Sequence, residues 1–113
     1  MECIKKERVR VVRLSDNVTV HEYDTVNKAI NGGIAKIHGR YPSKGHAMNL
    51  ECKELVCVLD GEGMFLCGEK KIRIAPGDVV LVDAKEKYVW QGELTLFMAT
   101  TPAFDPSQHI TTD

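Results

Sequence analysis

The sequence predicts an all-β fold, an antiparallel jelly-roll barrel of eight to nine short strands. Turn signals, most of them built on glycine, recur every ~8–12 residues, which is the spacing found in antiparallel sandwiches and barrels. Helical periodicity is weak along the whole chain, and no stretch predicts a confident helix. An eight-stranded jelly roll accounts for so many short strands without leaving long unpaired edges.

Three strands and one short candidate are expected in the first half of the chain. They are residues 9–14, 17–23 and 34–38, with the candidate at residues 47–50. Residues 31–33, Asn-Gly-Gly, indicate a turn or a bulge before the third strand. Residues 41–45 form a loop, because Pro42 has no N–H to donate to a central ladder.

Six further strands follow, at residues 55–59, 64–67, 72–74, 79–82, 88–90 and 94–99. The glycines of residues 61–63 and the polar residues 68–71 are interpreted as hairpin turns. Residues 55–59 and 79–82 are apolar on both strand faces, so we expect them to lie between two covered surfaces. Residues 101–113 are expected to form an irregular tail, with Phe104 packing back on the barrel.

Length and composition favour one compact domain over the 113 residues. Within residues 1–113 we expect an N-terminal strand arm over 1–24, a barrel core over about 31–100, and the tail. A net charge of −1 leaves no broad electrostatic footprint for nucleic acid or for an anionic membrane. We therefore expect neither as a partner.

The N-terminus and the cysteines favour a cytoplasmic protein. Charged residues follow Met1 at once, without the apolar segment that a signal peptide needs. None of the four cysteines forms a C-x-x-C pair, so we interpret them as small buried hydrophobic residues in a reducing compartment.

The order of features over residues 54–82 resembles the cupin superfamily. A carboxylate is followed by an apolar strand, a glycine turn, a hairpin, a Pro-Gly-Asp turn and a second apolar strand. In the first cupin motif a glycine lies seven positions after a glutamate, and here Glu54 and Gly61 have that spacing. The two histidines that precede the glutamate in that motif are replaced by Ala47 and Asn49.

The second cupin motif opens on a glycine and ends on a histidine. Gly77 matches the opening position, whereas Tyr88 stands at the histidine position. Residues 38–42, 52–55 and 101–104 are also similar to a group of small single-domain bacterial cupins. The resemblance implies a cupin-type double-stranded β-helix, the RmlC-like jelly roll, and it implies no particular activity.

A cupin metal centre uses three imidazoles and one carboxylate, a set suited to divalent transition metals. With Ala47, Asn49 and Tyr88 at the imidazole positions, we expect no tightly held metal and no other cofactor. If a divalent metal does bind weakly, the ligands expected from the sequence are Glu54, His46 and His38.

A carboxylate that points into an apolar barrel has to be paired, hydrogen-bonded or protonated. The candidate partners of Glu54 are Tyr88, Asn49, Arg40, His38 and Lys36. Tyr88 and Trp90 have the same strand parity, so Trp90 should line the interior if Tyr88 does.

The first hypothesis for function is a pocket that binds a small polar metabolite, either sugar-like or a carboxylate. Its expected residues are Asn49, Glu54, Tyr88 and Trp90, with Arg40 and His46 near the rim. The second is an enzyme, an isomerase, lyase or dioxygenase in which Glu54 acts as a base and Tyr88 as an acid. The third is a plugged barrel that serves as a structural or interaction protein.

A homodimer is the expected assembly. The outward apolar face at Leu55, Cys57 and Leu59 needs cover, and the N-terminal strand can add to the sheet of a second copy.

Overall fold

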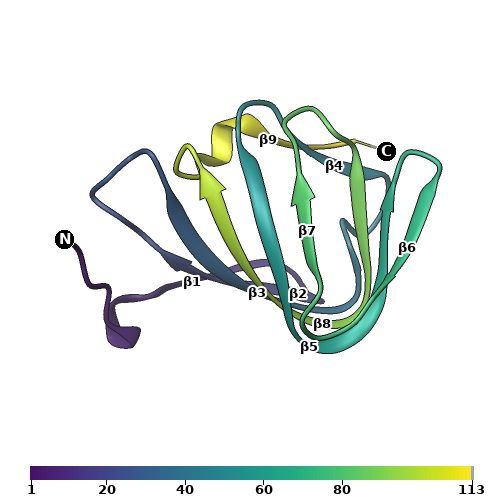
Figure 1. Ribbon diagram of the computed structural model, residues 1–113, viewed down its shortest axis with the longest axis horizontal. Helices are drawn as coiled ribbons and strands as arrows, with labels where there is room; N and C mark the ends of the chain where they lie inside the picture. Colours follow the sequence, from purple (N-terminus) through teal and green to yellow (C-terminus); the bar gives the residue numbers. More distant parts are fainter. Residues whose placement is uncertain (113) are drawn as a thin grey trace.

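The computed structural model describes residues 1–112 and confirms the all-β fold (Figure 1). Nine strands and two single-turn 3-10 helices make up this part of the chain. In chain order they are η1 (Lys6–Arg8), β1 (Arg10–Ser15), β2 (Val18–Tyr23), β3 (Asn31–Tyr41), β4 (His46–Asn49), β5 (Lys53–Cys67), β6 (Lys70–Ile74), β7 (Val79–Val82), β8 (Tyr88–Thr101), η2 (Pro106–Gln108) and β9 (His109–Thr112).

Three long antiparallel strands, β3, β8 and β5, form the centre of the sheet, and β8 lies between the other two. β2 and β1 extend the sheet beyond β3, and β7 and β6 pair with the two halves of β5. β4 pairs with the start of β8 and with β9. Figure 1 shows the long strands curling together, so that one face of the sheet becomes the concave inside of a barrel.

A row of glycines crosses the three long strands as register partners. Gly39 of β3 pairs with Gly92 of β8, which pairs with Gly63 of β5. A Cβ atom added to Gly63 or Gly92 would overlap the backbone of the neighbouring strand. The absence of side chains therefore allows all three strands to bend at the same level and contribute to both walls.

This row corrects the prediction of a hairpin turn at residues 61–63. The segment is the corner of a continuous β5, with a bulge between Val58 and Asp60. For the same reason residues 88–90 and 94–99 form one strand, β8, because Gly92 is the corner between them. Residues 31–33, expected to be a turn or bulge, are the first residues of β3.

The expected irregular tail is also corrected. Residues 106–112 form η2 and β9, and β9 pairs with β4 from His109 to Thr112. Phe104 does pack back, with its ring centroid 5.7 Å from that of His109. The N-terminal arm is part of the barrel as well, since Val18 and Val20 of β2 are buried in the core.

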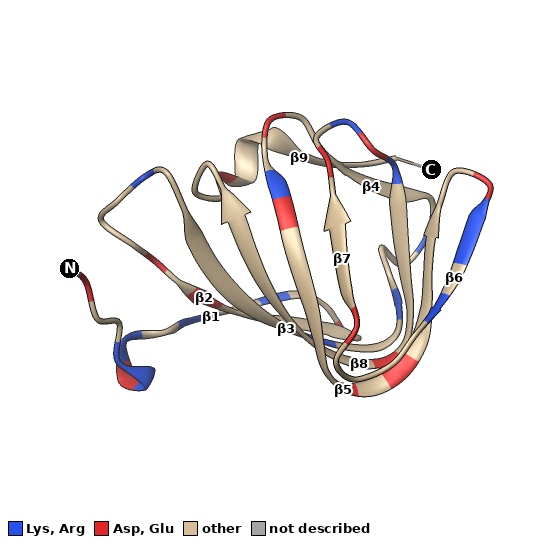
Figure 2. Cartoon of the chain, in the orientation of Figure 1, with Lys and Arg blue, Asp and Glu red and all other residues tan. Residues whose placement is uncertain are grey.

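The core lies on the concave side, where inward side chains from β2, β3, β5, β7 and β8 meet. Alternation leaves the opposite face open, so this chain alone covers residues 55–59 and 79–82, predicted to lie between two covered surfaces, on one side only. Leu55 is 51% exposed and Leu81 is 57% exposed, whereas Val56 and Val82 are buried. Figure 2 shows that β7 carries no charged residue along its length, so its outward face is apolar.

In the part of the chain that the structure describes, no helix is long and apolar enough to span a membrane.

Candidate functional site

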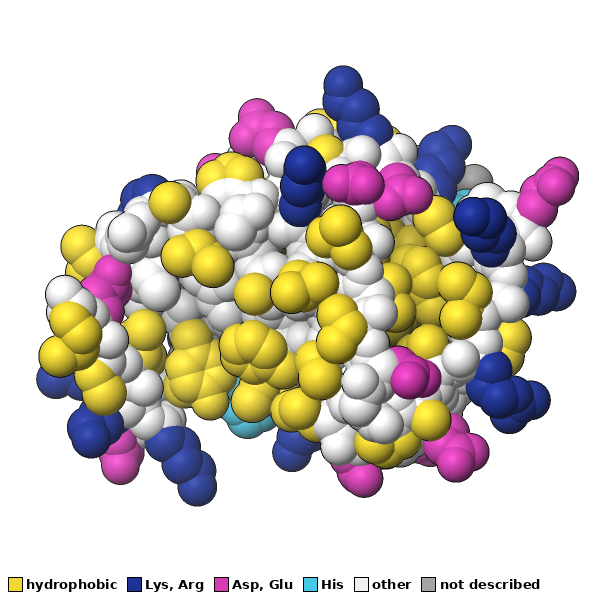
Figure 3. Space-filling view, viewed as in Figure 1, with side chains coloured by type: hydrophobic (Ala, Val, Ile, Leu, Met, Phe, Trp, Pro, Cys, Tyr) yellow, Lys and Arg dark blue, Asp and Glu magenta, His cyan; other side chains and the backbone are white. Residues whose placement is uncertain are grey.

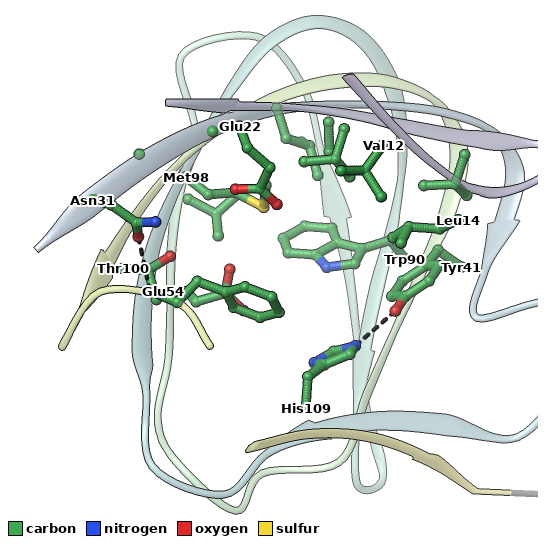
Figure 4. Close-up of a pocket in the computed structure, with 18 of the residues that line it drawn as sticks. Val12, Leu14, Glu22, Asn31, Tyr41, Glu54, Trp90, Met98, Thr100 and His109 are labelled. Carbon is green, nitrogen blue, oxygen red and sulfur yellow. Dashed lines mark hydrogen bonds between the residues drawn. The ribbon is translucent and has the colours of Figure 1, made fainter. Parts of the chain in front are cut away.

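A cavity of about 230 Å³ lies on the concave side of the sheet, between the two walls of the barrel (Figure 4). Most of its lining is apolar and comes from β1, β2, β3, β5, β7 and β8: Val12, Leu14, Val18, Val20, Ala35, Ile37, Val56, Val82, Trp90, Leu96 and Met98. Polar side chains also reach it: Glu22, Asn31, Tyr41, Glu54, Tyr88, Thr100 and His109. An apolar space with a few convergent polar groups is the usual form of a small-molecule site.

A chain of five hydrogen-bonded side chains runs along one side of this cavity, and each member comes from a different strand. The Tyr41 hydroxyl donates to His109 Nε2 over 2.6 Å, and His109 Nδ1 donates to Asn49 Oδ1 over 2.8 Å. Asn49 Nδ2 in turn donates to Glu54 Oε1 over 2.5 Å, and the Tyr88 hydroxyl donates to the Glu54 carboxyl. We call this set the polar chain.

The hydrogen bonds of the polar chain define which ring nitrogen of His109 carries the proton. Asn49 Oδ1 also accepts a hydrogen bond from Gln108 Nε2, so this oxygen needs donors and His109 Nδ1 has to carry the proton. Nε2 is then the acceptor for Tyr41. Burial lowers the pKa of His109, which favours this neutral form.

Burial is the main cause of the pKa shifts of Glu54 and Tyr88, at the other end of the polar chain. It raises the pKa of Glu54, although hydrogen bonds from Asn49 and Tyr88 act in the opposite direction. Burial, followed by the nearby charge of Glu54, raises the pKa of Tyr88 well above its ordinary value. The same two causes raise the pKa of Tyr41 to about 12. Both phenols are therefore hydrogen-bond donors at neutral pH, and Glu54 is held nearer to its protonated form than an exposed glutamate.

Four of the residues singled out from the sequence are brought together. Glu54, Tyr88 and Trp90 line the cavity, and Asn49 is bonded to Glu54 directly behind that lining. Tyr88 and Trp90 do point to the same side, as their parity predicts, and both are buried.

The other predicted residues lie elsewhere, so they are absent from the lining that the described residues form. Arg40 donates to the carbonyl oxygens of Pro42 and Gly45, which ties down the loop after β3. His46 is exposed at the start of β4, opposite Thr112 of β9. His38 is exposed and paired with Glu93, the neighbouring residue of β8. Arg40 and His46, which we expected near the rim, are therefore not among the residues that line the cavity.

Sequence reasoning missed Tyr41, His109 and Glu22. The sequence predicts a loop at Tyr41, because Pro42 follows it, and an irregular tail at His109, whereas both residues lie on strands. The short run from His109 to Thr112 is β-branched at three of its four positions, which was the available signal for a strand. Only pairing with β4 brings its histidine to Asn49.

The donor set does not fit a cupin metal centre. Ala47, at one histidine position of the motif, is fully buried with no donor atom, and Asn49 at the other is committed to Glu54, Gln108 and His109. His38 and His46, the fallback ligands, do not line the cavity that Glu54 borders. Within residues 1–112, no three His, Cys, Asp or Glu side chains are placed to share an ion.

Comparison with known proteins identifies the fold. No family model and no curated protein matches the sequence. Among solved structures, Pac13, a nucleoside dehydratase, aligns with a TM-score of 0.86 at 12% identity, over 99% of this chain and 91% of that chain. A Streptomyces Pac13 variant with uridine gives 0.87 at 12% identity, over 100% and 92%.

Two further neighbours come from other proteins. KdgF from Halomonas sp. aligns with a TM-score of 0.77 at 11% identity, over 94% of this chain and 99% of that chain. A cupin-2 domain protein from Rhodospirillum rubrum gives 0.75 at 13% identity, over 99% and 80%. The curled sheet with its central cavity defines a β-barrel of the jelly-roll class. Within that class the fold is that of the cupin superfamily, as the sequence predicted.

Proposed function

We propose that the protein binds a small polar metabolite in the cavity and does so without a tightly held metal. The observation that supports this most strongly is the polar chain, because it places two phenols, an imidazole and a carboxyl along one wall of an otherwise apolar space. A plug would need only enough hydrogen bonds to satisfy its own atoms. Here the side chains also border a cavity of about 230 Å³ that they do not fill.

The fold neighbours support the same proposal by analogy. Pac13 is described as a nucleoside dehydratase, and variants of it have been solved with uridine. Nucleosides belong with the sugar-like compounds predicted from the sequence, so uridine is a rational first compound to test. Fold analogy alone does not transfer a substrate.

The test uses Trp90, the only tryptophan, as an internal reporter. A panel of sugars, nucleosides, amines and carboxylates is titrated while the fluorescence is followed, and elemental analysis checks for metal. We expect saturable binding by at least one compound. Tyr41→Phe should weaken that binding by about fivefold to tenfold, the value of one hydrogen bond. Tyr23→Phe, which removes a hydroxyl outside the cavity lining, is the matched control.

A panel without any saturable response, from a folded protein, would contradict the proposed pocket and favour the plugged barrel. Stoichiometric metal would contradict the metal-free part of the proposal alone.

An enzyme is the second candidate, and a specific observation favours it. Two hydroxyl-to-base pairs, Tyr41 with His109 and Tyr88 with Glu54, face one cavity, which is the arrangement that proton transfer in an isomerase or lyase requires. Neutral His109 and the desolvated Glu54 are the bases, and the phenols are the acids. Incubating any compound that binds with the protein, and looking for product by NMR, separates binding from turnover.

We also propose a cytoplasmic homodimer. The outer face of β5, β7 and β8 carries exposed apolar side chains, which appear as yellow groups over the centre of Figure 3. Leu55, Val79, Leu81 and Phe97 on these strands are 51%, 57%, 57% and 39% exposed, and their register makes them neighbours. An apolar patch of this kind is typical of an interface.

Leu81→Lys is therefore expected to weaken self-association by about 2 kcal/mol, the effect of an interface hot spot. Val26→Lys is the control, since Val26 is 84% exposed in the loop before β3. Sedimentation equilibrium measures both. A wild-type protein that stays monomeric at high concentration would contradict the proposed homodimer.

A further inference from the structure

The charged groups of the cavity lining are unbalanced. Glu22, Asp24 and Glu54 face one cation, Arg10. Arg10 is already paired, because its Nε and Nη2 donate to the two oxygens of Asp24 over 3.0 and 3.1 Å. Burial lowers the pKa of His109, which favours its neutral form. Arg10 is also the register partner of Glu22 on β1, but its hydrogen bonds go to Asp24, and among the lining residues no cation is bonded to Glu22 or Glu54.

Glu22 is the carboxylate that the polar chain does not use. It enters the cavity from β2, and Figure 4 shows its carboxyl pointing toward the space between Met98 and Trp90. Its register partner on β3 is Gly33, which has no side chain to fill the space beside it, and Glu22 Oε2 lies over that glycine. Glu22 is partly buried, and its carboxyl is open to the cavity.

The carboxyls of Glu22 and Glu54 interact electrostatically. Burial raises the pKa of Glu22, Arg10 acts in the opposite direction, and the charges of Asp24 and Glu54 raise it further. Glu54 is buried and Glu22 is half-buried, and two such carboxylates that share a cavity are stabilised by a cation placed between them.

Thr100 marks the same part of the cavity. It lies on β8 between Glu54 of β5 and Asn31 of β3, to which it is paired in register. It is 4% exposed, and its hydroxyl has no hydrogen-bond partner among the described residues, yet it faces the cavity (Figure 4). No fully buried side-chain oxygen of residues 1–112 lacks a partner, so this hydroxyl is accessible from the cavity, and a ligand group within hydrogen-bond distance can bond to it.

Aromatic rings surround the remaining space. Trp90, Tyr41, Tyr88 and Phe104 all contribute to the lining. The faces of such rings carry partial negative charge and attract ammonium groups.

We infer that the ligand of this cavity carries an ammonium group, held between Glu22 and Glu54 beside the Thr100 hydroxyl, with its apolar body against Trp90. The inference rests on the proposed function and narrows it to organic amines. It also removes the carboxylate from the two ligand classes expected from the sequence, because a ligand carboxylate would meet two carboxyls and no available cation.

The test compares three probes that share one body: 2-phenylethylamine, 2-phenylethanol and 3-phenylpropionate. Each is titrated into the full chain while Trp90 fluorescence is followed. We expect the amine to bind about tenfold more tightly than the alcohol, and the carboxylate to bind weakest. In Glu22→Gln the amine should lose that tenfold advantage while the affinity for the alcohol stays unchanged, which also shows that the cavity is intact. Glu69→Gln, an exposed site on the β5–β6 turn, should retain the preference.

Equal affinity for amine and alcohol, a preference for the carboxylate, or no binding by any probe would overturn the inference. These results are separable from failure of the proposed function, which the metabolite panel decides. If the metabolite panel yields only neutral ligands, the proposed pocket is supported and the inference of an ammonium group is contradicted. If neither the metabolite panel nor the three probes bind, both the proposed pocket and the ammonium inference are contradicted.

Discussion

Gly61→Ala should destabilise the protein by roughly 3 kcal/mol or more, the cost of forcing a side chain into tightly packed backbone. Gly61 has a φ of +87° at the corner of β5, and a Cβ there would overlap the carbonyl of Glu93 on β8. Either β5 straightens or β8 moves, and both changes disturb the two walls of the cavity. Urea denaturation measures the loss of free energy of unfolding.

Gly77→Ala provides the matched control. Gly77 also has a positive φ, +94°, but it lies in the turn before β7 and a Cβ there would meet nothing within 4 Å. Only the backbone strain remains, so a cost of about 1 kcal/mol is expected. Equal losses for the two variants would contradict the account of the barrel corner.

Glu54→Gln should stabilise the protein at pH 7 while it weakens ligand binding. Burial raises the pKa of Glu54 above its ordinary value of 4.5. Above that pH the unfolded chain releases the proton more readily than the folded one, so this group lowers stability as pH rises through the interval up to its folded pKa. A neutral amide avoids this penalty and still accepts hydrogen bonds from Asn49 and Tyr88. The expected gain is on the order of 1–3 kcal/mol.

The upward shift of the Glu54 pKa determines the pH range in which the wild type and the variant should differ. Below pH 4.5 both states are protonated and the wild type and variant should converge, whereas the difference should grow as pH rises above it. Thermal unfolding across this range, with the exposed Glu7→Gln as control, measures the effect. A variant that is less stable at every pH would show that Glu54 is a structural plug and not a residue retained at the expense of stability.

The candidate site was predicted in part because strand parity is a local property. Glu54, Tyr88 and Trp90 occupy inward positions that can be read from alternation, and Asn49 followed from its motif position. Tyr41 and His109 could not be placed in this way. They meet over 68 residues of sequence, through pairing of β4 with β9 that no local pattern specifies.

Glycine was the main source of wrong predictions for the fold. Residues 61–63 have the composition of a hairpin turn, and a turn and a strand corner both require glycine. A strand corner differs from a hairpin turn in the residue that lies opposite the glycine on the neighbouring strand. Gly63 lies opposite Gly92, and Gly92 lies opposite Gly39, so the chain bends without reversing.

From the sequence alone, turn spacing, strand alternation and the Glu54–Gly61 motif determined the all-β cupin fold and one inward carboxyl. Local chemistry suffices for these because alternation and turn preference act over a few residues. Only the tertiary structure decided that β5 and β8 are continuous, that the tail returns as β9, and that Glu22 and His109 share a cavity with Glu54. These depend on which distant strands pair, and pairing is selected by the burial and hydrogen bonding of the whole sheet.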